Sequence, residues 1–277
     1  MTQLQETEFE ILKAFDAVCR KLDLPYFLVC GSALGAVKYG GFIPWDDDID
    51  VAMYREDYEV FLREAGNYLP DHLFLQNHHT EPAFPQIYSK LRNSATTYIE
   101  KSAQALPINH GVFLDIFPLD GYPDSRGSQR LLEIKKRLFL SMANSVYTVQ
   151  RSPAGKLACL VWKLLRVNAN PAAVAGWFER AIVKYPPGTS DVLCNHGNWQ
   201  GQLDYFPAEG FGEGAWMRFE GLQVRVPARY SVYLTRKYGD YLQDPPEEDR
   251  NGHHHYTVCD CQKPYTAYIG KTGDVRI

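Results

Sequence analysis

The stretch FLVCGSALGAVKYGGFIPWDDDIDVAM, residues 27–53, decides the fold. A short apolar run over residues 27–30 stops at Gly31 and Ser32, and residues 33–37 can open a helix. A strand, a tight turn and a helix start direct backbone N–H groups and a serine hydroxyl at an anion, most often a phosphate. Gly31 and Ser32 are therefore predicted to bind phosphate, although a single Gly-Ser pair is also common in ordinary turns.

An acidic segment follows the predicted turn. It contains four aspartates, Asp46, Asp47, Asp48 and Asp50. If residues 49–53 form a strand, its period of two places Asp48 and Asp50 on one face, while Ile49 and Val51 point into the core. Two carboxylates on one face repel each other, so the pattern predicts a site for a hard divalent metal. The alternative is that these aspartates are turn and capping residues.

A second acidic position lies in the segment GVFLDIFPLD, residues 111–120, which reads as a buried strand. Asp115 stands in the middle of this apolar run. A buried carboxylate needs a partner, so a metal shared with Asp48 and Asp50 explains it economically. A salt bridge or a capping contact from another segment is the alternative.

Composition describes an ordinary globular protein. The chain has 277 residues, of which 45% are hydrophobic and 22% charged, which suits one large domain or two small ones. A net charge of −4 gives no electrostatic case for a nucleic-acid partner. The 18 Tyr, 14 Phe and 5 Trp favour a groove that could hold a sugar or a base, besides their usual place in the core.

The N-terminal segment is acidic and amphipathic, and no stretch reaches about 18 apolar residues, so neither a signal peptide nor a transmembrane helix is predicted. Six scattered cysteines are then expected to be reduced thiols in the cytosol. We therefore expect a cytoplasmic location.

Periodicity gives the remaining organisation. It predicts helices over 6–22, 55–65 and 229–242, a strand over 84–91, a hairpin over 215–228, and helices throughout 128–185 with breaks near 152–153 and 168–171. This pattern favours an α/β (α+β) fold with a small mixed sheet flanked by helices. The predicted division is a catalytic core over 1–127, a helical subdomain over 128–190, and C-terminal strands and a helix over 191–277 that complete the active-site region.

Basic residues suggest two further contacts. The strand predicted over 84–91 runs into Lys90, Leu91 and Arg92, and its two basic residues suit a polyanionic substrate, although a solvated basic turn is an equal alternative. Residues 156–167 form an amphipathic helix with Lys156, Lys163 and Arg166 opposite its apolar side. Such a helix can lie on an anionic membrane, but packing against the core of a helical subdomain is the commoner arrangement.

A histidine run, residues 253–255, precedes Cys259 and Cys261 and raises the possibility of zinc. Cys-x-Cys is tighter than the usual spacing of structural zinc ligands, which disfavours this reading. Arg250 and the histidines, His253 first among them, are better explained as polar lining near an anionic ligand.

These segments together resemble the LicD family. The matching parts are GSALGAVKYGGFIPWDDDIDVAM, KLR at 90–92, GVFLDIFPLDG, and VPARYSVYLTRKYGDYLQDPP with Arg250 and the histidines. The family is similar to the catalytic domains of fukutin and fukutin-related protein and belongs to the nucleotidyltransferase-fold superfamily. The gap between Gly31-Ser32 and Asp48 is longer than in typical nucleotidyltransferases, but the LicD group shares the GFIPW insertion that lengthens it.

The resemblance implies a phosphotransferase that uses a CDP-alcohol, of which CDP-choline is the best known. The phospho-alcohol would pass to a hydroxyl of a cell-surface or envelope glycan, such as a teichoic-acid type glycan, with release of CMP. A lipid-linked acceptor would bring the enzyme to the inner face of the cytoplasmic membrane. Two alternatives stay open: a nucleotidyltransferase acting on a small alcohol or an antibiotic, and a non-catalytic nucleotide-binding protein.

Site roles follow position by position. Asp48 and Asp50 match the metal-binding pair, Asp115 the third carboxylate, and Gly31 and Ser32 the phosphate-contacting turn. One or two Mg²⁺ ions, or Mn²⁺, would neutralise charge on the diphosphate. Asp115 is also the expected general base, and we expect Lys90 and Arg92 to hold the departing CMP phosphate.

Overall fold

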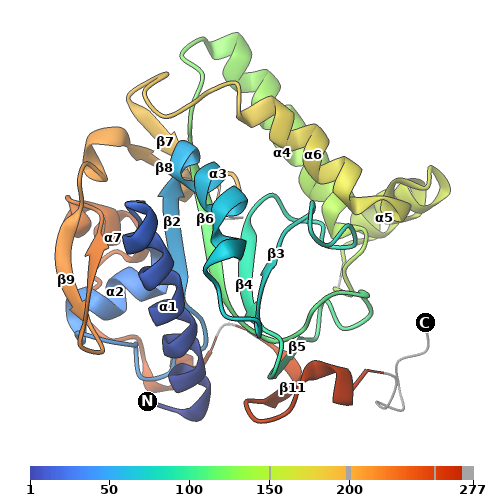
Figure 1. Ribbon diagram of the computed structural model, residues 1–277. Coiled ribbons are helices and arrows are strands. Elements are labelled where there is room, and N and C mark those ends of the chain that lie inside the picture. Colours follow the sequence, from blue (N-terminus) through green and yellow to red (C-terminus); the bar gives the residue numbers. More distant parts are fainter. Residues whose placement is uncertain (150, 198–200, 253, 270–277) are drawn as a thin grey trace.

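A mixed sheet organises the computed structural model, which describes residues 1–149, 151–197, 201–252 and 254–269 (Figure 1). Its main path is β1-β2-β6-β4-β3, with β7 paired to β6 and β8 paired to β7. The strands are β1 (Phe27–Leu28), β2 (Asp50–Tyr54), β3 (Leu73–Gln76), β4 (Ser89–Asn93), β6 (Val112–Gly121), β7 (Val192–Cys194) and β8 (Tyr205–Pro207). Among these strands β2 and β6 run parallel, and the other pairs are antiparallel.

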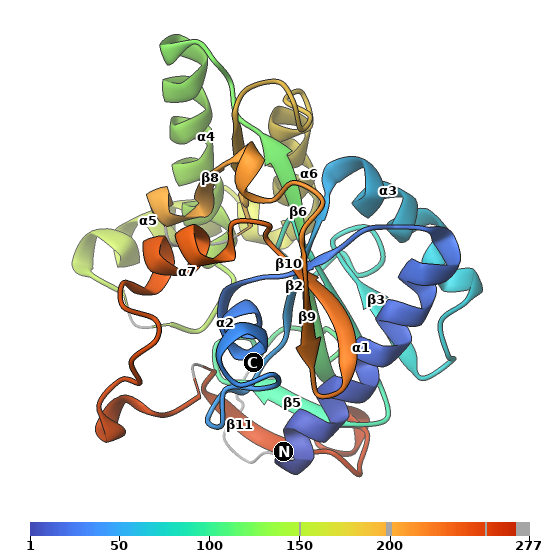
Figure 2. The same ribbon diagram turned by 90° about the vertical axis from the view of Figure 1, so that its left-hand side faces the viewer.

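Helices cover both faces of this sheet, which explains why all ten residues of β6 are buried. Seen along the sheet in Figure 2, α1 (Gln3–Leu22) and α3 (Arg55–Glu64) lie on one side, and α2 (Cys30–Lys38) and α7 (Tyr230–Tyr238) on the other. A capping box between Thr2 and Gln5 starts α1, and the left-handed residue Asp23 ends it.

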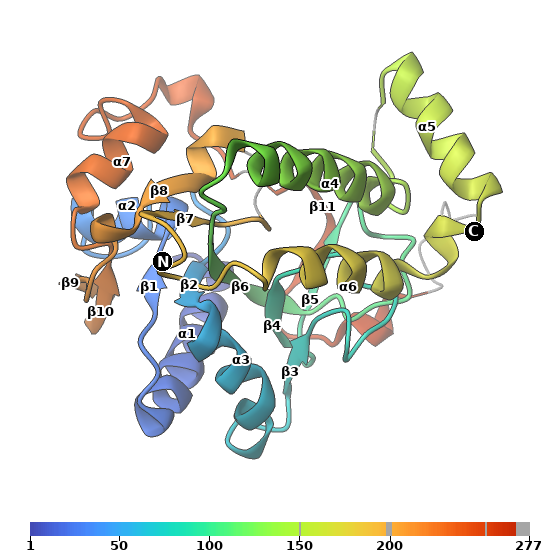
Figure 3. The same cartoon turned by 90° about the horizontal axis from the view of Figure 1, so that it is seen from above.

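Three helices form a separate group above the sheet: α4 (Arg126–Asn144), α5 (Pro153–Leu164) and α6 (Pro171–Ile182). Figures 1 and 3 show α4 and α6 side by side, with α5 at their far end. Buried residues of α4 and α6 pack with Ile87, from the segment before β4, in a hydrophobic cluster separate from the main core. The side chains of Ser152 and Asn170 cap α5 and α6 at the breaks predicted near 152–153 and 168–171.

The C-terminal segment packs on the side of the sheet that carries α2. The hairpin β9 (Ala215–Phe219) and β10 (Leu222–Val226) packs against β1 and α2, and α7 packs on α2. Farther along, β11 (Tyr256–Asp260) pairs antiparallel with β5 (Thr97–Glu100). Residues near 250 are thereby brought beside the acidic segment at 46–50.

The predicted mixed α/β fold is confirmed, with some local differences. The strand predicted over 84–91 is wrong in its first part, because β4 begins at Ser89, while Phe84 and Ile87 are buried in small clusters outside the ladder. The helix predicted over 229–242 ends early because Gly239 has a φ of 68°. Within the described residues no helix is long and apolar enough to cross a bilayer. The three-part division of the chain stays a prediction.

Candidate active site

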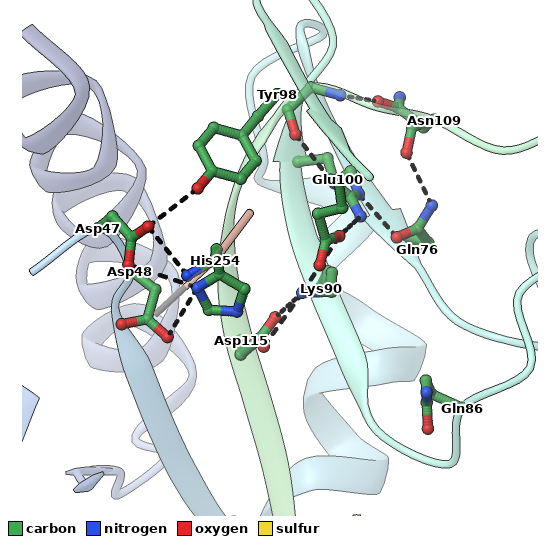
Figure 4. A network of polar contacts seen from close by, with 12 residues as sticks. Asp47, Asp48, Gln76, Gln86, Lys90, Tyr98, Glu100, Asn109, Asp115 and His254 are labelled. Atoms are coloured by element: carbon green, nitrogen blue, oxygen red, sulfur yellow. Dashed lines mark hydrogen bonds and ion pairs between the residues drawn. The ribbon is translucent and has the colours of Figure 1, made fainter. Parts of the chain in front are cut away.

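Three charged side chains lie in one row across the sheet. Asp50 of β2 is in register with Asp115 of β6, and Lys90 of β4 is in register with the same aspartate. Directly paired residues on neighbouring strands point to the same face, so the three converge. Lys90 Nζ lies 2.8 Å from Asp115 Oδ1 and 3.1 Å from Oδ2 (Figure 4). The sheet thus brings together two aspartates predicted from separate segments and one predicted cation.

The acidic loop before β2 is held by α1 and α2. Gln5 of α1 donates from Nε2 to the backbone oxygens of Ile43 and Asp46, at 3.3 and 3.0 Å. At Gly31 a Cβ would stand 2.6 Å from Asp46 Oδ2. Any side chain there would force that carboxylate to move, so the glycine permits a close approach of α2 to the acidic loop.

Ser32 joins the first turn of α2 to β2. Its buried Oγ accepts a 2.9 Å hydrogen bond from the backbone N–H of Asp50. The hydroxyl proton is not used in that bond, and the serine fixes where the Asp50 strand begins. Because α2 already begins at Cys30, the predicted strand over 27–30 shrinks to the two residues of β1.

His254 closes the opposite side of the acidic loop. Its Nδ1 lies 3.5 Å from Asp47 Oδ1 and 3.7 Å from Asp48 Oδ2, and its backbone N–H donates to Asp47 Oδ2 at 3.1 Å. Tyr98 of β5 also donates to Asp47 Oδ2, at 3.1 Å (Figure 4). A Cβ on Gly252 would come within 2.4 Å of that oxygen, so glycine is needed there too. The histidine run was the sequence signal for this contact, but His253, the member we had predicted, lies outside the described residues.

Arg92, predicted to hold a phosphate, lies on the same face of β4 as Lys90 but two residues farther along, and its donors are taken up by protein groups. Its side chain is wholly buried and donates to Gln76 Oε1 at 2.7 Å and to the backbone oxygen of Gly111 at 2.8 Å. Its Nη2 lies 3.3 Å from Glu100 Oε2. With these partners the guanidinium ties β4 to β3 and to the residue before β6, which favours a structural role for Arg92. Lys90, 4.0 Å from the same Glu100 oxygen, keeps its place beside Asp115.

Arg250 lies at the rim of the site. Its Nε donates to the backbone oxygen of Pro245 at 2.9 Å, and its guanidinium stands 5.3 Å from the centre of the Trp45 ring. The Asp244 carboxylate forms ion pairs with two cations: its Oδ1 lies 2.5 Å from Lys38 Nζ, and its Oδ2 lies 3.8 Å from Arg250 Nη2. This segment after α7 therefore forms one wall of the site.

These elements enclose a cleft of about 880 Å³. Asp46, Asp48, Asp50 and Asp115 line its floor together with Gly31 and His254. Its upper wall carries aromatic and acidic side chains: Tyr39, Trp45, Tyr238, Tyr241, Asp240, Asp244 and Asp249. A cleft of this size suits a nucleotide-sized ligand.

The floor of the cleft holds more negative charge than its cations balance. Burial raises the pKa of Asp46 to about 8, with added repulsion from Asp48. Burial also raises the pKa values of Asp48, Asp50 and Asp115. The pKa of His254 rises to about 9, because burial is outweighed by its contacts with the neighbouring carboxylates. Without another cation, these acids therefore stay close together only by binding protons more strongly than exposed carboxylates do.

Glu100, which neighbours Lys90 and Arg92, differs from these aspartates because its pKa is lowered. Burial opposes ionisation of Glu100, but Lys90 and Arg92 outweigh it and lower its pKa to about 2. Glu100 is therefore ionised and balances the two buried cations of β4. Lys90 consequently shares its charge between Glu100 and Asp115.

The donor set fits a hard divalent cation. Oxygen ligands on Asp48, Asp50 and Asp115 are the type that Mg²⁺ and Mn²⁺ prefer, and the excess negative charge described above would be offset by such an ion. Ligand atoms of Asp47, Asp48 and His254 also lie within 4.8 Å of one another. A second group, His78, His79 and Glu179, lies between the turn after β3 and α6. Neither group, among the described residues, includes Cys259 or Cys261.

Comparisons with known proteins agree with this architecture. Residues 23–137 match the family model described as LicD/FKTN/FKRP, nucleotidyltransferase domain. The matched range contains the acidic loop, β2, β4 and β6, so the acidic part of the site lies in a domain that matches the nucleotidyltransferase class.

One relative covers nearly the whole chain. It is the lipopolysaccharide cholinephosphotransferase LicD of Haemophilus influenzae, 31% identical over 263 residues, which span 88% of this chain and 92% of that protein. The chain therefore belongs to the LicD family. An uncharacterised protein of Rickettsia prowazekii is 34% identical over a shorter stretch of 56 residues, 20% of this chain and 21% of its own.

Proposed function

We propose that this chain transfers phosphocholine from CDP-choline to a hydroxyl of a cell-surface glycan, with the help of Mg²⁺. The observation that carries the proposal is the pair Asp50 and Asp115, which lines the cleft together with Asp48, with Lys90 beside Asp115. The printed activity of the Haemophilus relative, which is a lipopolysaccharide cholinephosphotransferase, favours phosphocholine and a glycan acceptor. A transferase is thus the function that the site and the family support best.

Asp48, Asp50 and Asp115 would hold the metal, one or two ions of Mg²⁺ or alternatively Mn²⁺. When bound, a divalent cation supplies positive charge to the diphosphate and to the oxygen that leaves with CMP. The unbalanced carboxylates at the floor of the cleft support this assignment.

Protein groups supply the remaining chemistry. Lys90 holds Asp115 at 2.8 Å and fixes the direction of its carboxylate. Asp115 is also the proposed proton acceptor for the glycan hydroxyl, because its carboxylate lines the cleft beside the other acids. Gly31, in the first turn of α2, lines the cleft and is the proposed phosphate contact, and Ser32 fixes the Asp50 strand beside it. Arg250 at the rim is placed to meet the nucleotide or its phosphates.

The upper wall of the cleft favours a cationic alcohol. Quaternary ammonium groups bind against aromatic faces, and carboxylates nearby add attraction. Tyr39, Trp45, Tyr238 and Tyr241 together with Asp244 provide both features. Ribitol and glycerol carry no charge, so they would gain little from this wall. We therefore favour CDP-choline over CDP-ribitol and CDP-glycerol.

The acceptor and the location belong to the same proposal. A lipid-linked glycan would be reached from the cytoplasm at the inner face of the membrane. The acidic cleft and the net charge of −4 give no support for a nucleic-acid substrate.

A donor panel tests the proposal. Purified protein with Mg²⁺ is incubated with CDP-choline, CDP-glycerol, CDP-ribitol or CTP, with and without a glycan acceptor, and the products are separated by ion-exchange chromatography. We expect acceptor-dependent CMP from CDP-choline at a rate at least about tenfold above the uncharged donors. Pyrophosphate from CTP would instead identify a nucleotidyltransferase. Tight donor binding with no product under any condition would favour a non-catalytic nucleotide-binding protein.

A further inference from the structure

The helix α5 carries an apolar stripe that the described structure leaves uncovered. None of its twelve residues is buried within the described range 151–197. Leu157, Leu160, Val161 and Leu164 follow the spacing of one helix face, and Leu164 is 75% exposed. The expectation that residues 156–167 pack against the core of a helical subdomain is therefore wrong for this face. The side of α5 that does pack carries Trp162, whose Nε1 donates to Ser141 of α4 at 2.9 Å.

The stripe on α4 extends this surface. Leu131, Ile134 and Leu138 are exposed, and with Ser141 they follow one helix face at steps of three and four residues. α5 therefore rests on one end of a face whose remaining part is apolar and open. We call the exposed side chains of α4 and α5 the apolar face. Its members are Leu131, Ile134, Leu138, Leu157, Leu160, Val161, Leu164 and Leu165. Figure 3 shows the two helices at the outer edge of the molecule.

Charge around this face has one dominant sign. Residues 126–184 contain eleven Lys and Arg but two acidic residues, although the whole chain has a net charge of −4. On α5 and the turn that follows, Lys156, Lys163 and Arg166 are all exposed. The acidic excess consequently lies in the rest of the chain, which includes the cleft. An anionic surface would attract the helical group and repel the remainder, so it would orient the molecule.

We propose that the apolar face docks on an anionic phospholipid bilayer. Exposed leucines beside lysine and arginine are the combination that binds the interface of an anionic membrane, where apolar side chains enter the acyl boundary and basic ones meet the headgroups. A second copy of this chain is a poorer occupant, because two such strongly basic faces would repel each other. The inference depends on this surface alone and holds whichever donor or acceptor the cleft takes.

Vesicle sedimentation tests the electrostatic part. The full chain is mixed with sucrose-loaded vesicles of phosphatidylcholine alone, or of phosphatidylcholine with about 30% of the anionic lipid phosphatidylglycerol. The charge variant carries Lys156→Gln, Lys163→Gln and Arg166→Gln. Its matched control carries Lys13→Gln, Arg63→Gln and Arg229→Gln, which removes the same charge from exposed residues outside the helical group that already pair with glutamates.

We expect binding to the anionic vesicles that weakens with salt and falls at least about tenfold in the charge variant, since each basic residue near such a surface contributes up to about fivefold. The control should bind within about twofold of the wild type. Equal binding to both vesicle types, or equal losses in the two variants, would overturn the proposal.

A second pair of variants tests the apolar part. Leu164→Ser removes an exposed apolar side chain of the apolar face, and Val232→Ser removes one of 58% exposure on α7. We expect vesicle binding to fall at least about threefold in Leu164→Ser and to stay unchanged in Val232→Ser. Circular dichroism checks that both remain folded. A stable dimer by light scattering that Leu164→Ser dissociates, with no vesicle binding by the wild type, would show that a second copy covers the face instead.

Discussion

The substitution Asp50→Asn should stabilise the metal-free protein while it abolishes the response to metal. Asp50 is in register with Asp115 on a neighbouring strand, about 4.8 Å away. Were both carboxylates ionised, their charges at that distance would repel by about 3 kcal/mol at an effective dielectric constant of about 20, and binding a proton to avoid this also lowers stability. Lys90 and His254 offset part of this, so we expect a net gain of about 1–2 kcal/mol in the free energy of unfolding.

Thermal unfolding followed by fluorescence measures the effect in EDTA and then with excess Mg²⁺ or Mn²⁺. For a domain of this size a gain of about 1–2 kcal/mol raises the Tm by about 2–8 °C. In the wild type a metal at about 100 times its Kd should add about 2.7 kcal/mol of stability, and this increment should be lost in the variant. Asp71→Asn, at an exposed position, is the matched control and should behave like the wild type.

Either of two results would refute this reasoning. One is an Asp50→Asn protein that is less stable than the wild type in EDTA, which would mean that Asp50 is already well compensated in the fold. The other is an undiminished rise in Tm with metal, which would place the cation elsewhere. Asparagine keeps the size and the backbone N–H of the native residue, so the bond to Ser32 Oγ survives the change.

Three further outcomes follow from the same contacts. The metal-free protein should lose stability as the pH rises from 6.5 to 9, because Asp46 (pKa about 8) and His254 (pKa about 9) both bind more protons in the folded than in the unfolded state. Denaturant titrations across this pH range measure the loss, and a stability that does not change with pH would contradict it. Arg55 of α3 pairs with the fully buried carboxylate of Asp120 at 2.7 Å. Arg55→Ala leaves that carboxylate unpaired and should lower the free energy of unfolding in urea by about 3–5 kcal/mol, against about 0.5 kcal/mol or less for the exposed Arg63→Ala. Arg92→Ala should lower stability by about 2–4 kcal/mol but leave the KM for the donor unchanged; a tenfold rise in KM would return Arg92 to the cleft.

Local signals in the sequence were sufficient for the acidic strands. Period-two alternation predicted a strand over 49–53 that contains Asp50, and a second strand with Asp115 in its middle, and both aspartates lie in strands. β2 begins at Asp50, so Asp48 precedes the strand. The need of a buried carboxylate for a partner predicted that the two would meet. It could not predict that Lys90 would be the residue beside them in register, because register between strands depends on the whole sheet.

Long-range contacts explain what the sequence left open. His254 reaches the acidic loop because β11 pairs with β5, and five-residue and four-residue strands with weak alternation gave no sign of that pairing. Arg92 resembles Lys90 in the sequence, but its partners come from a different strand and from the loop before β6. The amphipathic pattern of α5 is the same whether its apolar stripe meets a core or remains exposed, so its exposure could not be read from the pattern.

The most direct test of the central claim is ³¹P NMR of the purified protein with CDP-choline and a glycan acceptor. The account predicts that, with Mg²⁺, the diphosphate signals decay while CMP and a phosphodiester signal of the choline-modified glycan appear together. It also predicts that EDTA or Asp50→Asn lowers this rate by at least about 100-fold, while Asp71→Asn has no effect. Transfer at an undiminished rate in EDTA or in Asp50→Asn would contradict the claim that the acidic row is the catalytic metal site.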